Sequence, residues 1–164
     1  LGGIVLSRLI PVGGNRFDEA IINKIKKDMN FVIGEKSAEA IKKNIASAYA
    51  TDAQMDICGR NLVTGLPSEI TVTGECVHEA LAELFQSIVD SIKIILERTP
   101  PEISSDIYKS GLYLTGGSSR IQNLGQFIYD ELGLKVNLCE EPESTVIMGL
   151  GAVIEDPQLA KLAL

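Results

Sequence analysis

The chain has 164 residues, of which 45% are hydrophobic and 23% are charged, and its net charge at pH 7 is -7. These values predict one globular domain, or one domain with a smaller subdomain, and no apolar run approaches the roughly 20 residues that span a bilayer. The acidic balance disfavours nucleic acid and anionic lipid as partners, because both carry negative charge. No signal segment is present, and the chain begins with Leu1, which we interpret as the start of an excised part of a longer protein.

The three cysteines and the one histidine suggest no metal or redox site. Cys58, Cys76 and Cys139 are far apart without C-x-x-C spacing, and His78 lies within a long helical pattern. This usage favours a reducing cytoplasm over a disulfide framework or a zinc site. We predict that the cysteines are packing residues and that His78 is structural or on the surface.

The amino-terminal part predicts a strand followed by two amphipathic helices. Residues 4–11 have strand composition, and the Gly-Gly pair after them ends the strand. Apolar residues at three- and four-residue spacing predict a helix over 17–29. Ser37 is a candidate N-cap for a second helix that runs to about residue 49. Its buried stripe is predicted to contain Ala38, Ile41, Ile45 and Ala48.

The middle of the chain changes to a hairpin pattern and then to a long helix. Residues 56–61 and 70–73 predict two strands, and 66–68 predict a break between them. Residues 75–98 predict the longest helix, whose wide apolar stripe indicates burial on more than one side. Its main stripe contains Val77, Leu81, Leu84, Ile88, Ile92 and Ile95.

The last third alternates helices and strands. We predict, in order, a short helix begun by a proline, a strand, a helix, a strand and a small-residue segment with closely packed glycines, over residues 101–110, 112–115, 120–132, 135–138 and 145–152. This alternation predicts an α/β fold with a hairpin-rich insertion in the middle.

Three local patterns could bind a ligand, and each has a simpler interpretation. The segment LTGGSSR at 114–120 places two glycines between a strand and a helix, where backbone N–H groups can approach an anion. It could equally be a tight turn. Glu39 and Lys42 share a helical face suited to a ribose and a flat base, or they belong to a solvated face. The pair Gly13-Gly14 is a further glycine turn. No G-x-x-x-x-G-K-[ST] or G-x-G-x-x-G motif is present.

Together, the segments resemble the MreB/Mbl family of bacterial actin-like cell-shape proteins. VGGNRFDEAIIN at 12–23 resembles the family's V-G-G-D-x-x-D-E-A-I-I-N, and IGEKSAEAIK at 33–42 resembles I-G-E-x-T-A-E-x-I-K. GRNLVTGLP at 59–67 is similar to G-R-D-L-V-T-G-L-P. TPPE at 99–102 and LTGG at 114–117 follow in the family's order, so the likeness covers nearly the whole chain.

The resemblance implies the second domain of an actin-like ATPase fold, in which a ribonuclease-H-like mixed sheet is flanked by helices. It implies an α/β subdomain over 1–13 and 75–164, with a smaller α+β subdomain inserted over 14–74. Adenosine is expected between the 39–42 helix face and the 116–118 turn, with Gly14 near the ribose. The expected nucleotide-binding residues are Gly14, Glu39, Lys42, Gly116, Gly117, Ser118, Ser119 and Arg120.

Two residues depart from the family pattern. Asn15 stands where the family usually has Asp, and Ser118 stands where it has a third glycine. GGSSRI at 116–121 instead resembles the adenine loop of heat-shock chaperone ATPases, in which the arginine stacks on the base. The resemblance therefore makes Arg120 a candidate for base stacking.

The resemblance also implies what this chain lacks. In the superfamily, aspartates on two phosphate loops hold magnesium and the phosphates, and both loops are expected upstream of Leu1. We therefore expect no catalytic residue and no metal ligand here: ATP or ADP would bind with Mg²⁺ held mainly by the other half, and this part alone would not turn ATP over.

The implied function is that of a cytoskeletal protein whose ATP-gated filaments organise cell-wall elongation and rod shape. The expected partners are other copies of itself and cell-wall elongation proteins at the inner face of the cell membrane, with no nucleic acid and no direct membrane contact from this part. Two alternatives remain. The chain could be a nucleotide-binding lobe of a heat-shock-chaperone-like or sugar-kinase-like ATPase, or a protein-binding α/β module with a vacant cleft.

Overall fold

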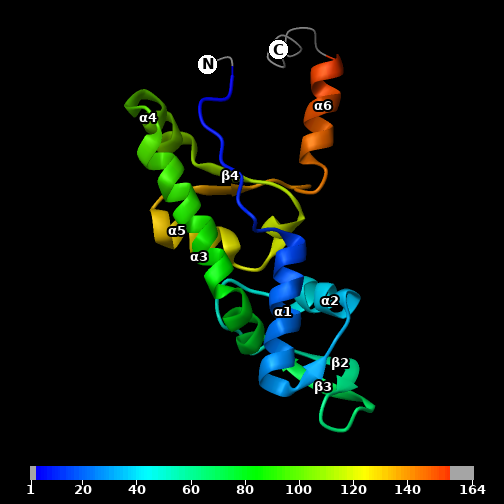
Figure 1. Cartoon of the computed structure of the whole chain (residues 1–164). Coiled ribbons are helices and arrows are strands. Elements are labelled where there is room, and N and C mark those ends of the chain that lie inside the picture. Colours follow the sequence, from blue (N-terminus) through cyan, green and yellow to red (C-terminus); the bar gives the residue numbers. More distant parts are fainter. Residues whose placement is uncertain (1–2, 156–164) are drawn as a thin grey trace.

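The computed structural model describes residues 3–155, which form helices around two small sheets (Figure 1). The elements in chain order are α1 (Gly14–Met29), β1 (Phe31–Val32), α2 (Glu35–Ile45), β2 (Gln54–Asn61), β3 (Pro67–Thr73), α3 (Gly74–Arg98), α4 (Pro101–Ser110), β4 (Leu112–Leu114), the 3-10 helix η1 (Gly117–Arg120), α5 (Leu124–Leu132), β5 (Val136–Leu138) and α6 (Thr145–Glu155). The predicted α/β class is confirmed.

The first sheet has the order β1-β2-β3, and both pairings are antiparallel. Gln54 pairs with Thr73 and Arg60 with Pro67, so β2 and β3 form the predicted hairpin. The break predicted at 66–68 is partly wrong, because Pro67 and Ser68 already belong to β3. Pro67 is tolerated there because it is the first residue of its strand, where a missing N–H costs little.

Helix α3 connects the two sheets through one hydrophobic core. Its most buried line recurs every four residues and contains Val77, Leu81, Phe85 and Val89. The Phe85 ring lies 5.6 Å from that of Phe17 in α1 and 6.3 Å from that of Phe127 in α5, measured between centroids. Side chains from both predicted subdomains therefore share a single core cluster.

The second sheet contains β4 and β5 in parallel, with Leu112 opposite Val136 and Leu114 opposite Leu138. The connection between them passes through η1 and α5, as a parallel pair requires a crossover. The turn that carries the glycine pair therefore follows the carboxyl end of β4, which is where ligands sit in open α/β sheets.

The strand predicted for residues 4–11 is wrong. The segment is irregular, and Ile4 and Leu9 expose 87% and 98% of their surface. A strand requires a hydrogen-bonding neighbour, and no strand among residues 3–155 pairs with this segment. Figure 1 shows it in dark blue as an extended trace that leads into α1.

Two helix boundaries also differ from the prediction. Helix α2 begins at Glu35 after an extended Gly34, so Ser37 is not its N-cap, and it ends at Ile45 because the next residues turn extended to form a β-bridge. The predicted stripe of Ala38, Ile41, Ile45 and Ala48 is nevertheless fully buried. The helix predicted over 120–132 is instead a short 3-10 turn followed by α5.

Helix α6 exposes most of its apolar side chains. The exposed large residues of α6 are Val146, Ile147, Met148, Leu150 and Ile154. The predicted close packing at Gly149 and Gly151 is wrong, because a Cβ added at either would meet nothing within 4 Å. Within residues 3–155, no helix combines the length and apolar composition needed to cross a bilayer.

The cysteine prediction is partly wrong. All three cysteines are free, but Cys58 is exposed on β2 and does not pack in the core, whereas Cys76 and Cys139 are half-buried. Alternation along a half-exposed hairpin explains the difference, because Cys58 follows the inward-facing Ile57.

Candidate functional site

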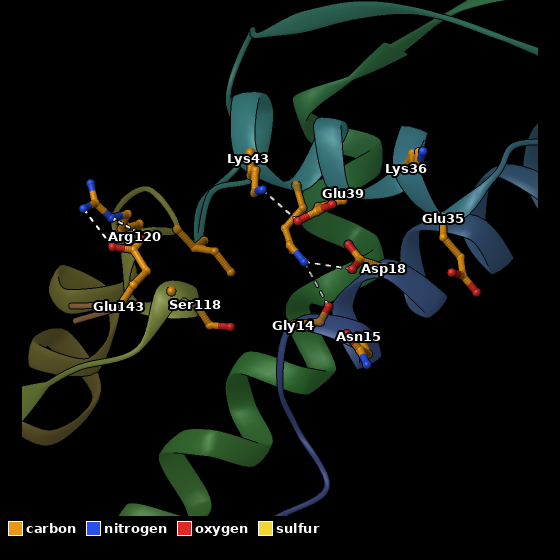
Figure 2. Close-up of a pocket in the computed structure, with 13 residues that line it drawn as sticks. Gly14, Asn15, Asp18, Glu35, Lys36, Glu39, Lys43, Ser118, Arg120 and Glu143 are labelled. Atoms are coloured by element: carbon orange, nitrogen blue, oxygen red, sulfur yellow. Dashed lines mark hydrogen bonds and ion pairs between the residues drawn. The ribbon is translucent and has the colours of Figure 1, made fainter. Parts of the chain in front are cut away.

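A cavity of about 800 Å³ lies between α1, α2, η1 and the loop before α6 (Figure 2). Six of the eight predicted nucleotide-binding residues line this cavity: Gly14, Glu39, Lys42, Gly117, Ser118 and Arg120. The structure thus brings the glycine turn and the face of α2 to opposite sides of one space, although they are more than 70 residues apart in the chain.

A β-bridge connects the segments that follow the two walls, α2 and η1. Ser47, just after α2, pairs in parallel with Gln122, just after η1. The N–H of Ala48 donates to the Gln122 carbonyl at 2.9 Å, and the Gln122 N–H donates to the Ala46 carbonyl at 3.3 Å. The Asn123 amide also donates to the Ser47 hydroxyl at 3.1 Å. These bonds fix the distance between the walls.

The remaining two predicted residues, Gly116 and Ser119, shape the turn without lining the cavity. Gly116 has φ of 85°, a left-handed conformation that glycine adopts without strain. Its N–H donates to the Pro142 carbonyl at 2.7 Å, and the buried Ser119 hydroxyl donates to the Gly116 carbonyl at 2.7 Å. These two hydrogen bonds hold the turn in a conformation in which Gly117 and Ser118 line the cavity.

The structure changes the expected anion-binding character of this turn. The predicted helix would have placed its free N–H groups beside Ser118, but α5 begins only at Leu124, which does not line the cavity. Only the four-residue η1 follows Gly116. The turn can therefore contact a ligand by close backbone approach, but it lacks the dipole of a long helix.

The α2 wall presents two ion pairs. Lys42 Nζ lies 2.8 Å from Asp18 Oδ2 and 3.1 Å from the Gly14 carbonyl oxygen, so it joins α2 to α1. Lys43 Nζ lies 2.7 Å from Glu39 Oε1. Lys43, through its hydrogen bond and its charge, holds the pKa of the Glu39 carboxyl below its ordinary value. Glu39 is therefore an ionised acceptor at neutral pH.

Arg120 and Glu143 form a two-point ion pair at the opposite rim. Arg120 Nε lies 2.7 Å from Glu143 Oε1, and Arg120 Nη2 lies 2.9 Å from Glu143 Oε2. The hydrogen bond from Arg120 lowers the pKa of the Glu143 carboxyl. Such a planar fork fixes the orientation of the guanidinium. In Figure 2 this pair lies on the η1 side, across the cavity from Asp18.

Several residues that line the cavity were not predicted from the sequence. These are Asn15 and Asp18 on α1, Glu35, Lys36 and Lys43 on α2, and Ile121 and Glu143 near the opposite wall. Helical spacing could have found some of them, because Asp18 follows Gly14 by four residues, and Lys36 and Lys43 flank Glu39 at three and four residues. Nothing in the sequence pattern indicates Glu143, whose position depends on how its loop folds against η1.

The cavity suits a neutral, hydrogen-bonding ligand group better than a metal ion. Three of its lysine and arginine side chains are already paired with carboxylates. Across residues 3–155, no group of three or more His, Cys, Asp or Glu side chains is arranged to hold a metal. These residues therefore do not fit a magnesium site, and no chemical step through magnesium is assigned to them.

Comparison with known proteins decides the family. The model of the MreB/Mbl protein family matches residues 1–162. This chain belongs to the MreB/Mbl family. It is 40% identical over 157 residues to the cell shape-determining protein MreB of Escherichia coli K12, which covers 94% of this chain and 45% of that protein. It is also 40% identical over 158 residues to the cell shape-determining protein Mbl of Bacillus subtilis, with 95% and 47% covered.

Solved structures of similar proteins share the fold. MreB5 of Spiroplasma citri bound to ADP is 35% identical with a TM-score of 0.88, over 92% of this chain and 46% of that one. The same protein bound to AMPPNP is 36% identical, also with a TM-score of 0.88, over 93% and 46%. The MamK double helical filament, 23% identical with a TM-score of 0.69 over 82% and 42%, shows the shared fold.

This MreB/Mbl chain spans about half the length of the curated relatives that it matches. The family match favours the actin-like filament class over the chaperone-like and sugar-kinase-like alternatives. The two MreB5 structures hold ADP and AMPPNP, respectively.

Proposed function

We propose that this chain forms one side of an adenine-nucleotide site, in a cell-shape protein that polymerises into filaments. The observation that carries the proposal is the cavity of about 800 Å³ in which α1, α2 and η1 converge. Its volume is within the range usual for sites of small ligands and cofactors. Relatives of the same family that bind ADP and AMPPNP supply the ligand class.

In this proposal the adenosine lies between the α2 face and the Gly117-Ser118 backbone. The ionised Glu39 accepts a hydrogen bond from a ribose hydroxyl, and the ribose lies near Gly14. Arg120, whose guanidinium plane is fixed by Glu143, stacks on the base. Gly116 and Ser119 contribute by holding the turn, so their substitution would act indirectly.

The remaining parts of the nucleotide are proposed to lie toward groups outside this chain. No residue here is assigned a catalytic role, and Mg²⁺ is proposed to be held mainly by the rest of the protein. Hydrolysis of ATP requires charged groups around the γ-phosphate. ATP would then bridge two halves and favour their closure, which changes how subunits stack.

The proposed cellular role follows from the family. We propose that the whole protein forms filaments by heterologous end-to-end contacts, a geometry that does not close into a ring. Its partners would be further copies of itself and proteins of cell-wall elongation, at the inner face of the cell membrane. The naming of its relatives as cell shape-determining proteins supports this role.

We also propose the division into an α/β part over 1–13 and 75–164 and an inserted part over 14–74. The separate three-stranded sheet in the middle of the chain supports it. The shared core around α3 implies that the two parts unfold together.

The first test is a calorimetric titration of the full-length protein with ADP and, for comparison, with GDP. The second is sedimentation of the full-length protein with and without ATP. We expect saturable ADP binding at one site per chain, and polymers whose amount depends on ATP. A full-length protein that binds no adenine nucleotide would contradict the proposal and favour a protein-binding module with a vacant cleft.

A further inference from the structure

Lys42 is held by two acceptors on α1. Its ammonium donates to Asp18 Oδ2 at 2.8 Å and to the Gly14 carbonyl at 3.1 Å. A lysine ammonium has three N–H donors, so one remains for a ligand in the cavity that Lys42 lines. The two bonds therefore fix both the place of the ammonium and the direction of its third donor.

The pair is sheltered from water, unlike the other ion pairs of the cavity. The Lys42 and Asp18 side chains expose 13% and 15% of their surface, whereas those of Arg120 and Glu143 expose 57% and 52%. Partly buried charges are weakly screened, so the two charges largely cancel at this wall. A cancelled charge attracts a phosphate weakly, while the third N–H and the stem of Lys42 can still contact a neutral group.

Asp18 has no second partner that would explain its position. Its other oxygen, Oδ1, is buried and accepts no hydrogen bond from any residue within 3–155. A carboxylate held in this way is costly to bury, and its pairing with Lys42 is the compensation that the structure offers. The ion pair with Lys42 is therefore what stabilises the Asp18 carboxylate in its buried position beside the cavity.

We infer that Asp18 is a positioning residue that fixes and neutralises Lys42, so that Lys42 recognises the nucleoside part of the nucleotide and not its phosphates. This inference rests on the proposed nucleotide site and adds a role for a residue that the sequence pattern did not single out. It makes the opposite prediction to a phosphate-binding lysine, for which Asp18 would be a competing anion.

The substitution Asp18→Asn in the full-length protein separates the two. If Lys42 contacts the nucleoside, the loss of its fixed orientation lowers the affinities for ADP and for adenosine by the same factor, about tenfold. If Lys42 binds phosphate, removing the competing carboxylate strengthens ADP binding and leaves adenosine unchanged. Both ligands are titrated by calorimetry, at two salt concentrations.

The matched control is Asp28→Asn. Asp28 lies on the same helix and pairs with Lys24 at 2.7 Å, but it does not line the cavity, so the same chemical change should leave both affinities unaltered. The double variant Asp18→Asn/Lys42→Met guards against misfolding, because it removes both charges together. In the Lys42→Met background, Asp18→Asn should cost no further affinity for adenosine.

The outcomes are distinct. Equal weakening of ADP and adenosine that vanishes in the Lys42→Met background supports the positioning role. Tighter ADP binding, unchanged affinities, or an equal loss in both backgrounds overturns it while the nucleotide site stands. A wild-type protein that binds neither ligand overturns the proposed function and the inference together.

Discussion

Glu39 is one helical turn from Lys42, but the two side chains have different partners. Lys42 reaches across to α1, whereas Glu39 pairs with Lys43 on its own helix. Glu39 keeps its carboxylate at the cavity and is half exposed, so its state responds to its neighbour and to solvent. The charge on Lys43 therefore controls the acceptor that we assign to the ribose.

The first prediction concerns this control. Because the positive charge of Lys43 favours the ionised form, the pKa of Glu39 lies below its ordinary value of 4.5, and proton uptake occurs only at lower pH. Lys43→Met should raise the pKa of Glu39 to about its ordinary value. The carboxyl carbon shift of Glu39 in an NMR pH titration measures this directly.

Lys93→Met is the control, because Lys93 pairs with Glu131 away from the cavity. It should leave the Glu39 titration unchanged. If the titration midpoint of Glu39 is the same in wild type and in Lys43→Met, the ion pair does not affect the pKa of this carboxylate in solution.

At the scale of elements, the separation of the cavity walls depends on the segment between η1 and α5. Asn123 has φ of 60°, a left-handed conformation that Asn tolerates better than other residues with a side chain, and its amide donates to Ser47. Asn123 thus both adopts the left-handed backbone conformation that the turn requires and donates a hydrogen bond that links the two walls.

Substitution of Asn123 tests these two contributions separately. Asn123→Gly loses only the bond to Ser47 and should lower the free energy of unfolding by about 1 kcal/mol. Asn123→Ala adds the strain of a left-handed Ala and should cost roughly 2–3 kcal/mol in total. Denaturant unfolding of the two variants provides the measurement, and equal costs would show that backbone strain contributes nothing here.

Elements were predictable where local signals were strong. The periodic helices α1 and α3, the proline-started α4 and the strands of the hairpin follow from spacing and turn residues. The strand over 4–11, the end of α2 and the start of α5 did not follow, because each depends on a long-range partner: a missing strand neighbour or the bridge from Ser47 to Gln122. Local propensity does not contain that information.

The site was predictable in part for the same reason. The two glycine pairs and the Glu39/Lys42 face carry family motifs, and six of the eight residues derived from them line the cavity. Asp18 belongs to the quoted motif but received no role, because only the packing of α1 against α2 reveals its contact with Lys42. Glu143 carries no pattern of its own.

At the scale of the whole molecule, the exposed apolar surface of α6 contrasts with the closed core around α3. Val146, Ile147 and Ile154 expose 66%, 70% and 85% of their surface. In Figure 1, α6 extends away from the two-stranded sheet. The chain spans about half of its relatives, so the cavity and its ligand are best tested in the full-length protein.

The most direct test of the central claim is an experimental structure of the full-length protein with ADP at saturating concentration. The account predicts the adenosine between the Glu39/Lys42 face of α2 and the Gly117-Ser118 turn, with the Asp18–Lys42 contact intact. Adenosine bound elsewhere, or a cavity without nucleotide at saturating ADP, would contradict it.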